Sequence, residues 1–247
     1  MAAQAAAVGI RALLFDLDNT LVDTAGASSR ALRRVEDLLK SQYGYEESTA
    51  KLVIEKFNTK LQMENLDCIP GVNIDEERIL LFEAALQETD GLDPDQGLAA
   101  KCYFLWKATR LQHMHIPNEV KAMLRSLRHS YKLLLLTNGS ATVQREKISA
   151  CQCQQYFDTI VIGGEHQEQK PALSIFQKCF QLLGVEADGC MMIGDNLDTD
   201  IKGGVNAGLG ATVWINNTNV TCDEGAMPDY TVKSVLEVMD ILGKERV

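Results

Sequence analysis

Short apolar runs that alternate with longer amphipathic segments are the feature that most limits how this chain can fold. Runs of this kind are typical of strands that are buried on both faces of a parallel sheet. Strands that alternate with segments of helical length and spacing predict βαβ units. We therefore expect an α/β fold with a doubly wound parallel sheet, whose strands cover residues 10–15, 132–136, 159–162, 190–193 and 211–215, with 230–232 at the edge.

The stretch of residues 24–115 has a different pattern from the rest of the chain. It contains no strand-like apolar run, and Leu32, Val35 and Leu39 follow the spacing of a helix. We expect helices in this stretch at 28–43, 48–64, 75–89 and 96–112, and elsewhere at 118–128, 141–151, 172–183 and 200–207. The sequence thus predicts a sheet domain made of residues 8–23 and 116–247, interrupted by an all-helical domain of residues 24–115.

Polar residues and glycines follow the predicted strands. The segments concerned are 16–20 (Asp-Leu-Asp-Asn-Thr) after the first strand, 137–139 (Thr-Asn-Gly) after the second and 194–195 (Gly-Asp) after the fourth. The carboxyl ends of parallel strands meet at one edge of the sheet, where ligands bind. Asp16 and Asp18 point the same way in an extended chain, and two such carboxylates repel each other unless a cation lies nearby. Each motif alone is equally consistent with a turn or a solvated surface, so the inference rests on their joint order.

Residues 15–21, Phe-Asp-Leu-Asp-Asn-Thr-Leu, resemble the first signature of the haloacid dehalogenase (HAD) superfamily, most of whose members are phosphatases. Its other signatures follow in order: the segment 137–139, Lys170-Pro171 before a predicted helix, and Gly194-Asp195 with Asp200 five residues later. The resemblance covers nearly the whole chain. It implies a Rossmann-like HAD core with an inserted helical cap of the first cap class (C1) at residues 24–115.

The resemblance implies a role for each acidic motif. Asp16 would be the nucleophile that attacks phosphorus, and Asp18 would act first as general acid and then as general base. The implied cofactor is Mg²⁺, which prefers oxygen ligands and would be held by Asp16, Asp195 and the backbone carbonyl of Asp18. Asp200 would orient Lys170 or the metal-binding loop rather than bind the metal itself.

The resemblance also implies a phosphate-binding set, which consists of Leu17, Thr137, Asn138 and Lys170. Thr137 would bind a phosphate oxygen through its hydroxyl group, and Asn138 would do so through its backbone N–H. Lys170 would neutralise the negative charge of the nucleophile and the phosphate together. Groups of this kind stabilise charge where it develops in the transition state.

Asp18 separates two reactions that the superfamily signature would allow. A halide leaves without a proton, whereas an alkoxide leaving group needs one, so an acid at position 18 favours phosphoryl transfer over dehalogenation. Several reaction classes remain open at this point. The chain could be a phosphatase for a small metabolite such as phosphoglycolate or a sugar phosphate, a phosphomutase, or an inactive binding module built on the same fold.

Six segments resemble HAD phosphatases that act on the 9-phosphate of sialic acid, namely 23–28, 102–107, 109–114, 133–139, 144–148 and 211–216. This resemblance implies hydrolysis of an acidic sugar phosphate during sialic acid biosynthesis. Such a substrate carries a carboxylate and a phosphate, both of which suit a cation in the cap. The candidates are Arg30, Lys107 and Arg110, for which the alternative is a solvated helix face or a pair with a nearby acid.

Composition restricts partners and location. The chain has 24 basic and 34 acidic residues, a net charge of −10, which argues against a nucleic-acid partner. It contains no run of 18 apolar residues, and its alanine-rich start is too short and weak for a signal peptide, so we expect no membrane association. Seven cysteines at scattered spacing favour free thiols in the cytoplasm over a disulfide framework. The oligomeric state stays open, with a monomer favoured.

The two links between the predicted domains are candidates for hinges. The expected hinge segments are 23–26, where Gly26 would add freedom, and 115–117, where Pro117 would stiffen the chain. Closure about such links would exclude bulk water from a bound substrate.

Overall fold

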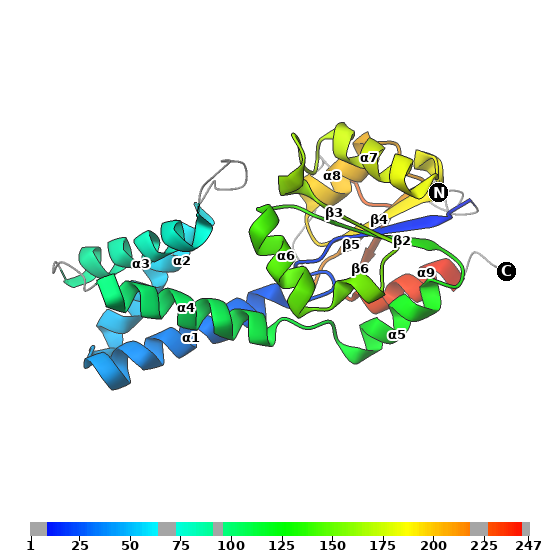
Figure 1. Ribbon diagram of the computed structural model, residues 1–247. Coiled ribbons are helices and arrows are strands. Elements are labelled where there is room, and N and C mark those ends of the chain that lie inside the picture. The colour runs from blue at the N-terminus through cyan, green and yellow to red at the C-terminus, as the bar shows by residue number, and fades with distance from the viewer. Residues whose placement is uncertain (1–8, 64–72, 91–95, 218–226, 244–247) are drawn as a thin grey trace. The chain divides into compact units, whose positions relative to one another are not determined.

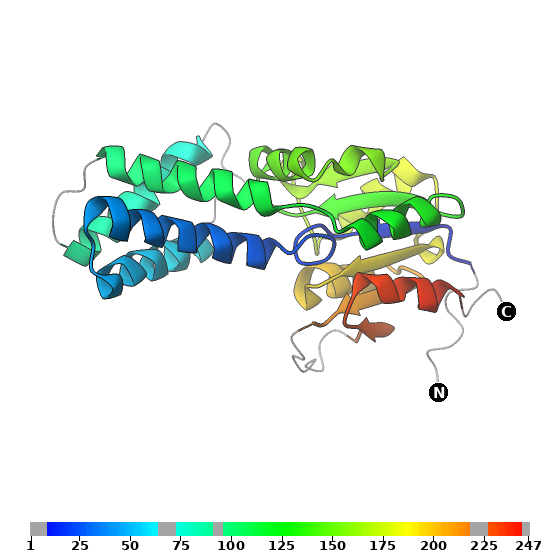
Figure 2. The same cartoon turned by 90° about the horizontal axis from the view of Figure 1, so that it is seen from below.

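The structure is a computed structural model that describes residues 9–63, 73–90, 96–217 and 227–243. The chain forms two compact units. One unit combines the residues up to Asp23 with those from His115 onward, and the other unit is Thr24–Met114. Figures 1 and 2 show the sheet and its covering helices in the first unit and a group of helices in the second.

The first unit is built on a six-stranded sheet in the order β3-β2-β1-β4-β5-β6, and every neighbouring pair of strands is parallel. The strands are β1 (Ala12–Phe15), β2 (Lys132–Thr137), β3 (Thr159–Ile162), β4 (Cys190–Gly194), β5 (Ala211–Ile215) and β6 (Tyr230–Val232). The predicted doubly wound parallel sheet is therefore confirmed. The strand order changes direction between β1 and β4, and a switch of this kind opens a ligand crevice at the carboxyl ends of the two strands.

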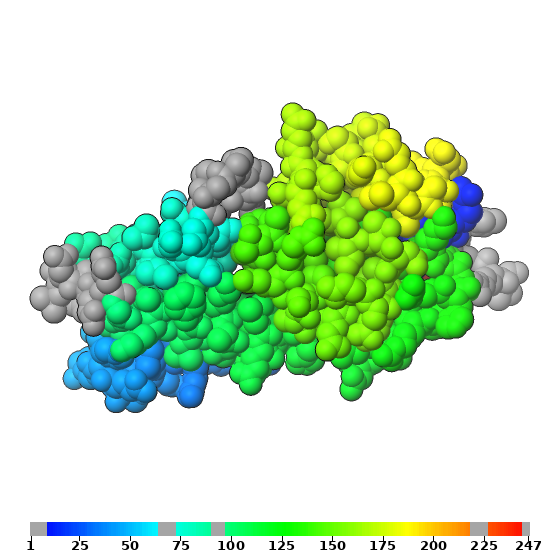
Figure 3. Space-filling model, viewed as in Figure 1, coloured from blue at the N-terminus to red at the C-terminus, as the bar shows by residue number. Residues whose placement is uncertain are grey.

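Helices cover both faces of this sheet. Helices α5 (Asn118–Leu127) and α9 (Val238–Gly243) lie on one face, and α7 (Leu173–Leu183) and α8 (Lys202–Asn206) lie on the other (Figures 1 and 2). Helix α6 (Ala141–Ala150) follows β2. Side chains of β1 alternate between the two faces, and Leu14 packs with Phe176 of α7 in one buried cluster. All four residues of β1 are fully buried, and the space-filling view shows blue atoms of the N-terminal segment only at the edge of this unit (Figure 3).

One helical prediction in this unit differs from the structure, and one short helix was not predicted. The segment expected as a helix at residues 200–207 begins earlier, as a π-helical turn at Leu197–Ile201 that leads into the short helix α8. Helix α9 was not among the predicted helices, because it is only six residues long and has little periodicity to reveal it.

The second unit consists, in its described residues, of helices α1 (Thr24–Tyr43), α2 (Glu47–Gln62), α3 (Ile74–Asp90) and α4 (Gln96–His113). Its core is aromatic: the rings of Phe57 and Phe82 stack with centroids 3.6 Å apart, and Trp106 meets Phe57 edge-on at 5.5 Å. Burial of each such side chain contributes about 1.5–3 kcal/mol. The unit therefore has its own hydrophobic core.

The expected hinge segment 23–26 is shorter than the sequence suggested. Helix α1 begins at Thr24, so Gly26 lies in its first turn rather than in a link. Pro117 lies immediately before α5, where its fixed φ angle of −57° suits the start of a helix. Across the described ranges, no helix combines the length and apolar character that a bilayer crossing requires.

Candidate active site

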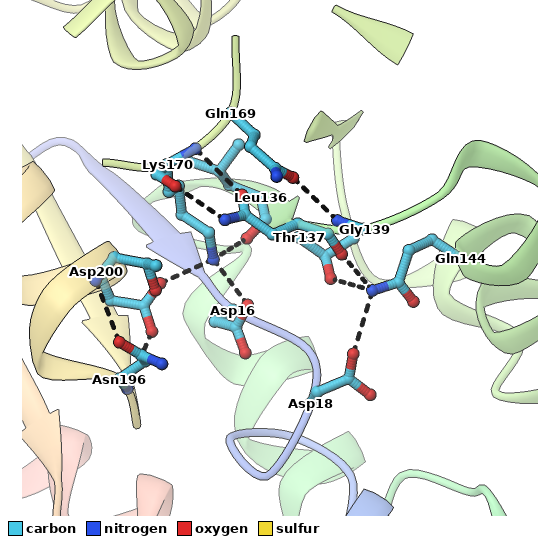
Figure 4. Close-up of polar contacts among 12 residues, drawn as sticks. Asp16, Asp18, Leu136, Thr137, Gly139, Gln144, Gln169, Lys170, Asn196 and Asp200 are labelled. Atoms are coloured by element: carbon cyan, nitrogen blue, oxygen red, sulfur yellow. Dashed lines mark hydrogen bonds and ion pairs between the residues drawn. The ribbon is translucent and has the colours of Figure 1, made fainter. Parts of the chain in front are cut away.

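The buried ammonium group of Lys170 lies at the centre of the candidate site (Figure 4). Its Nζ lies 2.6 Å from Oδ1 of Asp16, 2.6 Å from Oδ1 of Asp200 and 2.8 Å from the carbonyl oxygen of Leu136. Three acceptors match the three N–H donors of an ammonium group, which allows the charge to be buried. Burial alone would lower the pKa of Lys170, but the charges of Asp16 and Asp200 outweigh it and hold that pKa above its usual value, so Lys170 is a cation.

The loop that carries Lys170 is held by the segment that follows β2. The side-chain amide of Asn138 donates from Nδ2 to the carbonyl oxygen of Lys170 (2.8 Å), and its Oδ1 accepts from the backbone N–H of Lys170 (3.0 Å). The backbone N–H of Gly139 donates to Oε1 of Gln169 at 3.1 Å. Only the backbone of Asn138 was expected to act in the site, but its side chain fixes the position of Lys170.

Three carboxylates gather beside Lys170. Oxygen atoms of Asp16, Asp195 and Asp200 all lie within 4.8 Å of one another, a donor set that suits Mg²⁺. Burial raises the pKa of Asp16, against the opposing effect of Lys170. Burial, with the charge of Asp200, also raises the pKa of Asp195 to about 6. Ionised, the three acids carry more negative charge than Lys170 offsets, so the residues present fit a divalent cation.

The segment after β4 places Asp200 against the sheet. The side chain of Asn196 accepts hydrogen bonds from the backbone N–H groups of Asp198 (2.9 Å) and Thr199 (3.0 Å), which caps the π-helical turn. Oδ2 of Asp200 accepts from the backbone N–H of Asn196 at 3.1 Å. A Cβ atom on Gly194 would lie 2.2 Å from this carboxylate, so only glycine permits the close approach. The carbonyl of Asp195 is fixed by the indole N–H of Trp214 at 2.9 Å.

A tight turn follows β1, in which the backbone N–H groups of Leu21 and Val22 donate to the carbonyl of Leu17. Asn19 has a φ of +57°, a left-handed conformation that asparagine tolerates better than most residues, and its N–H donates to the carbonyl of Val22 at 2.8 Å. The side chain of Leu17 is fully buried, which leaves its backbone N–H as the group that would contact a phosphate. The two carboxyl groups do not share partners as an extended chain would suggest: Asp16 contacts Lys170, whereas Asp18 points away from Lys170 and toward helix α6 (Figure 4).

Two residues of α6 bind Asp18, and the sequence analysis assigned a role to neither. Nζ of Lys147 lies 2.7 Å from Oδ2 of Asp18, and Nε2 of Gln144 lies 3.0 Å from the same oxygen (Figure 4 shows the Gln144 contact). Nε2 of Gln144 also lies 3.0 Å from Oγ1 of Thr137 and hydrogen-bonds the carbonyl of Asn138, so its two N–H hydrogens are shared among three acceptors. Their spacing of three residues puts them on one helix face, but nothing in the local sequence shows that this face is the buried one.

The three candidates for substrate recognition all lie in the helical unit. Arg30 is exposed on α1. Nζ of Lys107 on α4 lies 2.7 Å from Oδ1 and 3.1 Å from Oδ2 of Asp75. The guanidinium group of Arg110 stands over the ring of Trp106, 5.2 Å from its centroid. Lys107 therefore forms an ion pair with an acid, which was the alternative to substrate binding. The role of all three toward a substrate stays a prediction.

These features define a Rossmann-like α/β core: acids and a buried lysine lie at the carboxyl ends of a parallel sheet, and a helical unit is inserted after the first strand. A model of the haloacid dehalogenase-like hydrolase family matches residues 10–208, and the chain belongs to this family.

Named relatives and solved structures agree with this assignment. The chain is 53% identical to the N-acylneuraminate-9-phosphatase of Mus musculus and 52% identical to that of Homo sapiens, in each case over 94% of both chains. A HAD phosphatase from Thermococcus onnurineus has a TM-score of 0.65 at 25% identity, over 96% of this chain and all of that one. A magnesium-bound HAD hydrolase from Bacillus subtilis has a TM-score of 0.69 at 24% identity, over 94% of this chain and 98% of that one, and shows the shared fold.

Proposed function

We propose that this protein is a Mg²⁺-dependent phosphatase that hydrolyses N-acylneuraminate 9-phosphate to the free sialic acid and phosphate. The observation that carries the proposal is the 53% identity to the mouse N-acylneuraminate-9-phosphatase over 94% of both chains. That span includes the helical insert as well as the sheet unit. In HAD enzymes the sheet unit binds the phosphate, so a likeness that extends through the insert supports a shared substrate and not only a shared reaction.

In the first step, a carboxylate oxygen of Asp16 attacks phosphorus and forms an aspartyl-phosphate. The bond between phosphorus and the C9 oxygen of the sugar breaks at the same time. The protonated carboxyl group of Asp18 gives its proton to that oxygen, which leaves as a hydroxyl group. The position of Asp18, two residues beyond Asp16 and directed away from Lys170, supports this division of roles.

In the second step, a water molecule attacks the phosphorus of the aspartyl-phosphate. The Asp18 carboxylate takes a proton from that water, and the bond between phosphorus and Asp16 breaks. Phosphate leaves, Asp16 is again a carboxylate, and Asp18 is again protonated. The same carboxyl group thus serves as acid and then as base.

The phosphate would be held by the Thr137 hydroxyl and by the backbone N–H groups of Leu17 and Asn138. Oγ1 of Thr137 accepts a hydrogen bond from Gln144, so its own proton is directed to another acceptor. Lys170 would neutralise the charge shared by Asp16 and the phosphate, and its 2.6 Å contact with Asp16 supports this role. Asp200, also 2.6 Å from Lys170, would keep the ammonium group in place.

Asp16, Asp195 and the backbone carbonyl of Asp18 would hold Mg²⁺. When bound, the ion supplies the positive charge that lets a carboxylate approach an anionic phosphate. The acidic cluster that Asp16 and Asp195 form with Asp200 supports a cation at this position.

We further propose that residues 24–115 act as a substrate-recognising cap on a catalytic core of residues 8–23 and 116–247. Arg30, Lys107 and Arg110 are the candidates to bind the carboxylate of the sugar. The partner is a small acidic sugar phosphate rather than nucleic acid or a membrane. A cytoplasmic location is supported by five cysteines that are buried and free among the described residues.

The test is phosphate release from N-acetylneuraminate 9-phosphate beside phosphoglycolate and a hexose 6-phosphate, with Mg²⁺ and then with EDTA. We expect kcat/KM to be highest for the nine-carbon substrate and activity to be lost in EDTA. Metal-dependent release without that preference would contradict the substrate assignment. Return of the phosphate to a sugar would indicate a mutase, and no release from any substrate would favour a binding module.

A further inference from the structure

The carboxyl group of Asp18 is held by two neighbouring side chains of helix α6. Lys147 reaches it with an ammonium nitrogen at 2.7 Å, and Gln144 reaches it with an amide nitrogen at 3.0 Å. Both contacts fall on Oδ2. A proton carried by Asp18 would therefore reside on Oδ1, because Oδ2 already accepts two hydrogen bonds.

Both donors are buried although they are polar: Lys147 is 5% exposed and Gln144 is 3% exposed. An ammonium group in such a place is held firmly by a carboxylate partner, because separation would leave its charge desolvated. The Asp18 side chain is 26% exposed, so one end of this ion pair is fixed in the protein interior and the other reaches the open side of the site. A buried ion pair of this kind holds the Asp18 side chain in place more firmly than an ion pair on the surface would.

Gln144 also connects Asp18 to Thr137 and Asn138, two of the residues proposed to hold the phosphate. Its Nε2 lies 3.0 Å from Oγ1 of Thr137 and hydrogen-bonds the carbonyl of Asn138. The Asp18 carboxylate and the Asn138 carbonyl can only accept, which sets the amide with its nitrogen toward both. One amide group therefore fixes the position of the acid and base relative to the groups that hold the phosphate.

We propose that Lys147 and Gln144 are positioning residues for the two proton transfers of Asp18, an inference that rests on the proposed phosphatase function. Neither residue gives or takes a proton in this scheme. They keep Oδ1 of Asp18 directed at the leaving oxygen while the phosphorus–oxygen bond breaks, and then at the attacking water. Displacement of a catalytic group by even 1 Å can lower a rate about 100-fold.

The substitution Lys147→Met tests the proposal, because it removes the charge and keeps most of the buried stem. It is compared on two substrates: the sugar 9-phosphate, whose alkoxide must be protonated, and p-nitrophenyl phosphate, whose leaving group is stable as an anion. For the sugar phosphate we expect kcat to fall roughly 10- to 100-fold, with KM nearly unchanged. With p-nitrophenyl phosphate we expect the variant to form the aspartyl-phosphate at a nearly unchanged rate, because this leaving group needs no proton. Hydrolysis of the aspartyl-phosphate should be slower, because the water must still give its proton to Asp18. We therefore expect a burst of nitrophenol that is larger, relative to the steady rate, than in the wild type.

Matched variants separate this effect from a general loss of structure. Arg145→Met makes the same kind of change on the same helix, at a side chain that is 68% exposed and paired with Glu165, and should leave both substrates unaffected. Lys147→Arg keeps the charge and should restore part of the rate. Gln144→Leu should give the same substrate-dependent pattern with a smaller loss. If thermal unfolding shows that Lys147→Met is not folded, Gln144→Leu tests the positioning role in its place.

A further check uses the Asp18→Asn background. If Lys147 acts only through Asp18, the substitution Lys147→Met should cause no additional loss there. An equal loss on both substrates without a burst, or a loss no larger than that of Arg145→Met, would overturn the positioning role alone. Failure of the wild-type protein to hydrolyse either substrate would overturn the proposed function and this inference together.

Discussion

Lys170 and Asp200 form an ion pair in which Nζ and Oδ1 are 2.6 Å apart and each side chain is only 1% exposed. Asp16 makes a second contact of the same length with the same ammonium group. The ammonium group of Lys170 therefore connects its own loop to the end of β1 through Asp16 and to the segment after β4 through Asp200. Its geometry links the stability of the sheet unit to the position of the proposed nucleophile.

Asp200→Asn should destabilise the protein, because it removes one of two charges that compensate a buried cation. Loss of one partner of a buried pair costs about 3–5 kcal/mol, and we expect about 3 kcal/mol because Asp16 remains. Urea unfolding measures the change. Asp198→Asn on the same turn is the matched control, since Asp198 is exposed. Equal stability of the two variants would show that the Lys170–Asp200 pair does not support the fold.

Gly194→Ala should be poorly tolerated, because the new Cβ would lie 2.2 Å from the Asp200 carboxylate. Overpacking of this kind costs about 1–3 kcal/mol, and it should also displace Asp200 from Lys170. Thermal unfolding and phosphate release measure the two effects. Gly9→Ala is the control, because no heavy atom beyond Gly9 and its two chain neighbours lies within 4 Å of the added Cβ. If Gly194→Ala has the same Tm and the same rate of phosphate release as Gly9→Ala, the close contact between Gly194 and Asp200 does not restrict this position.

Asp16→Asn should abolish turnover and leave the protein folded. The amide keeps the size of the side chain but is a far weaker nucleophile, so we expect kcat to fall by at least about 10⁴-fold. Phosphate release and circular dichroism are the measurements. A folded variant with substantial remaining activity would exclude Asp16 as the nucleophile.

Mg²⁺ should raise Tm, and the increase should grow between about pH 5 and pH 7. Burial and the charge of Asp200 raise the pKa of Asp195 to about 6 from 3.8, so the folded metal-free protein binds this proton more tightly than the unfolded chain does. The associated stability is present at low pH and is lost as the pH rises through about 6. Above that pH the carboxylate is ionised and available to a cation.

Thermal scans with and without Mg²⁺ at both pH values test this expectation. Asp195→Asn should remove most of the Mg²⁺ effect, whereas Asp198→Asn should leave it intact. An increase in Tm that is the same at both pH values, or that survives in Asp195→Asn, would contradict a Mg²⁺ site at Asp195.

The sheet was largely predictable because strands that are buried on both faces consist of short runs of apolar residues. β1, β2 and β4 lie where the apolar runs and the polar residues after them indicated, and the carboxyl ends bring Asp16, Lys170 and Asp200 into contact. The predicted ends of the helices and strands were less accurate. Gly26 was expected in a link but lies within α1, since a single glycine does not end a helix whose other residues favour it.

The surroundings of Asp18 could not be predicted from the sequence. Gln144 and Lys147 are polar residues on a helix, and such residues are most often exposed. Only the packing of α6 beside residues 137–139 buries them and brings them to Asp18. The same holds for the side chain of Asn138, whose two bonds to Lys170 join residues 32 positions apart. Tertiary contacts of this kind leave no local pattern.

In the proposed reaction, Asp16 takes the phosphoryl group from a nine-carbon sugar phosphate, and both chemical steps depend on this transfer. The most direct measurement is rapid acid quench of the wild-type protein during turnover of N-acetylneuraminate 9-phosphate with Mg²⁺, followed by peptide mass spectrometry. We predict one added phosphoryl group on Asp16, absent in EDTA and absent from Asp16→Asn. A phosphoryl group on another residue, or efficient turnover with none on Asp16 at any quench time, would contradict the account.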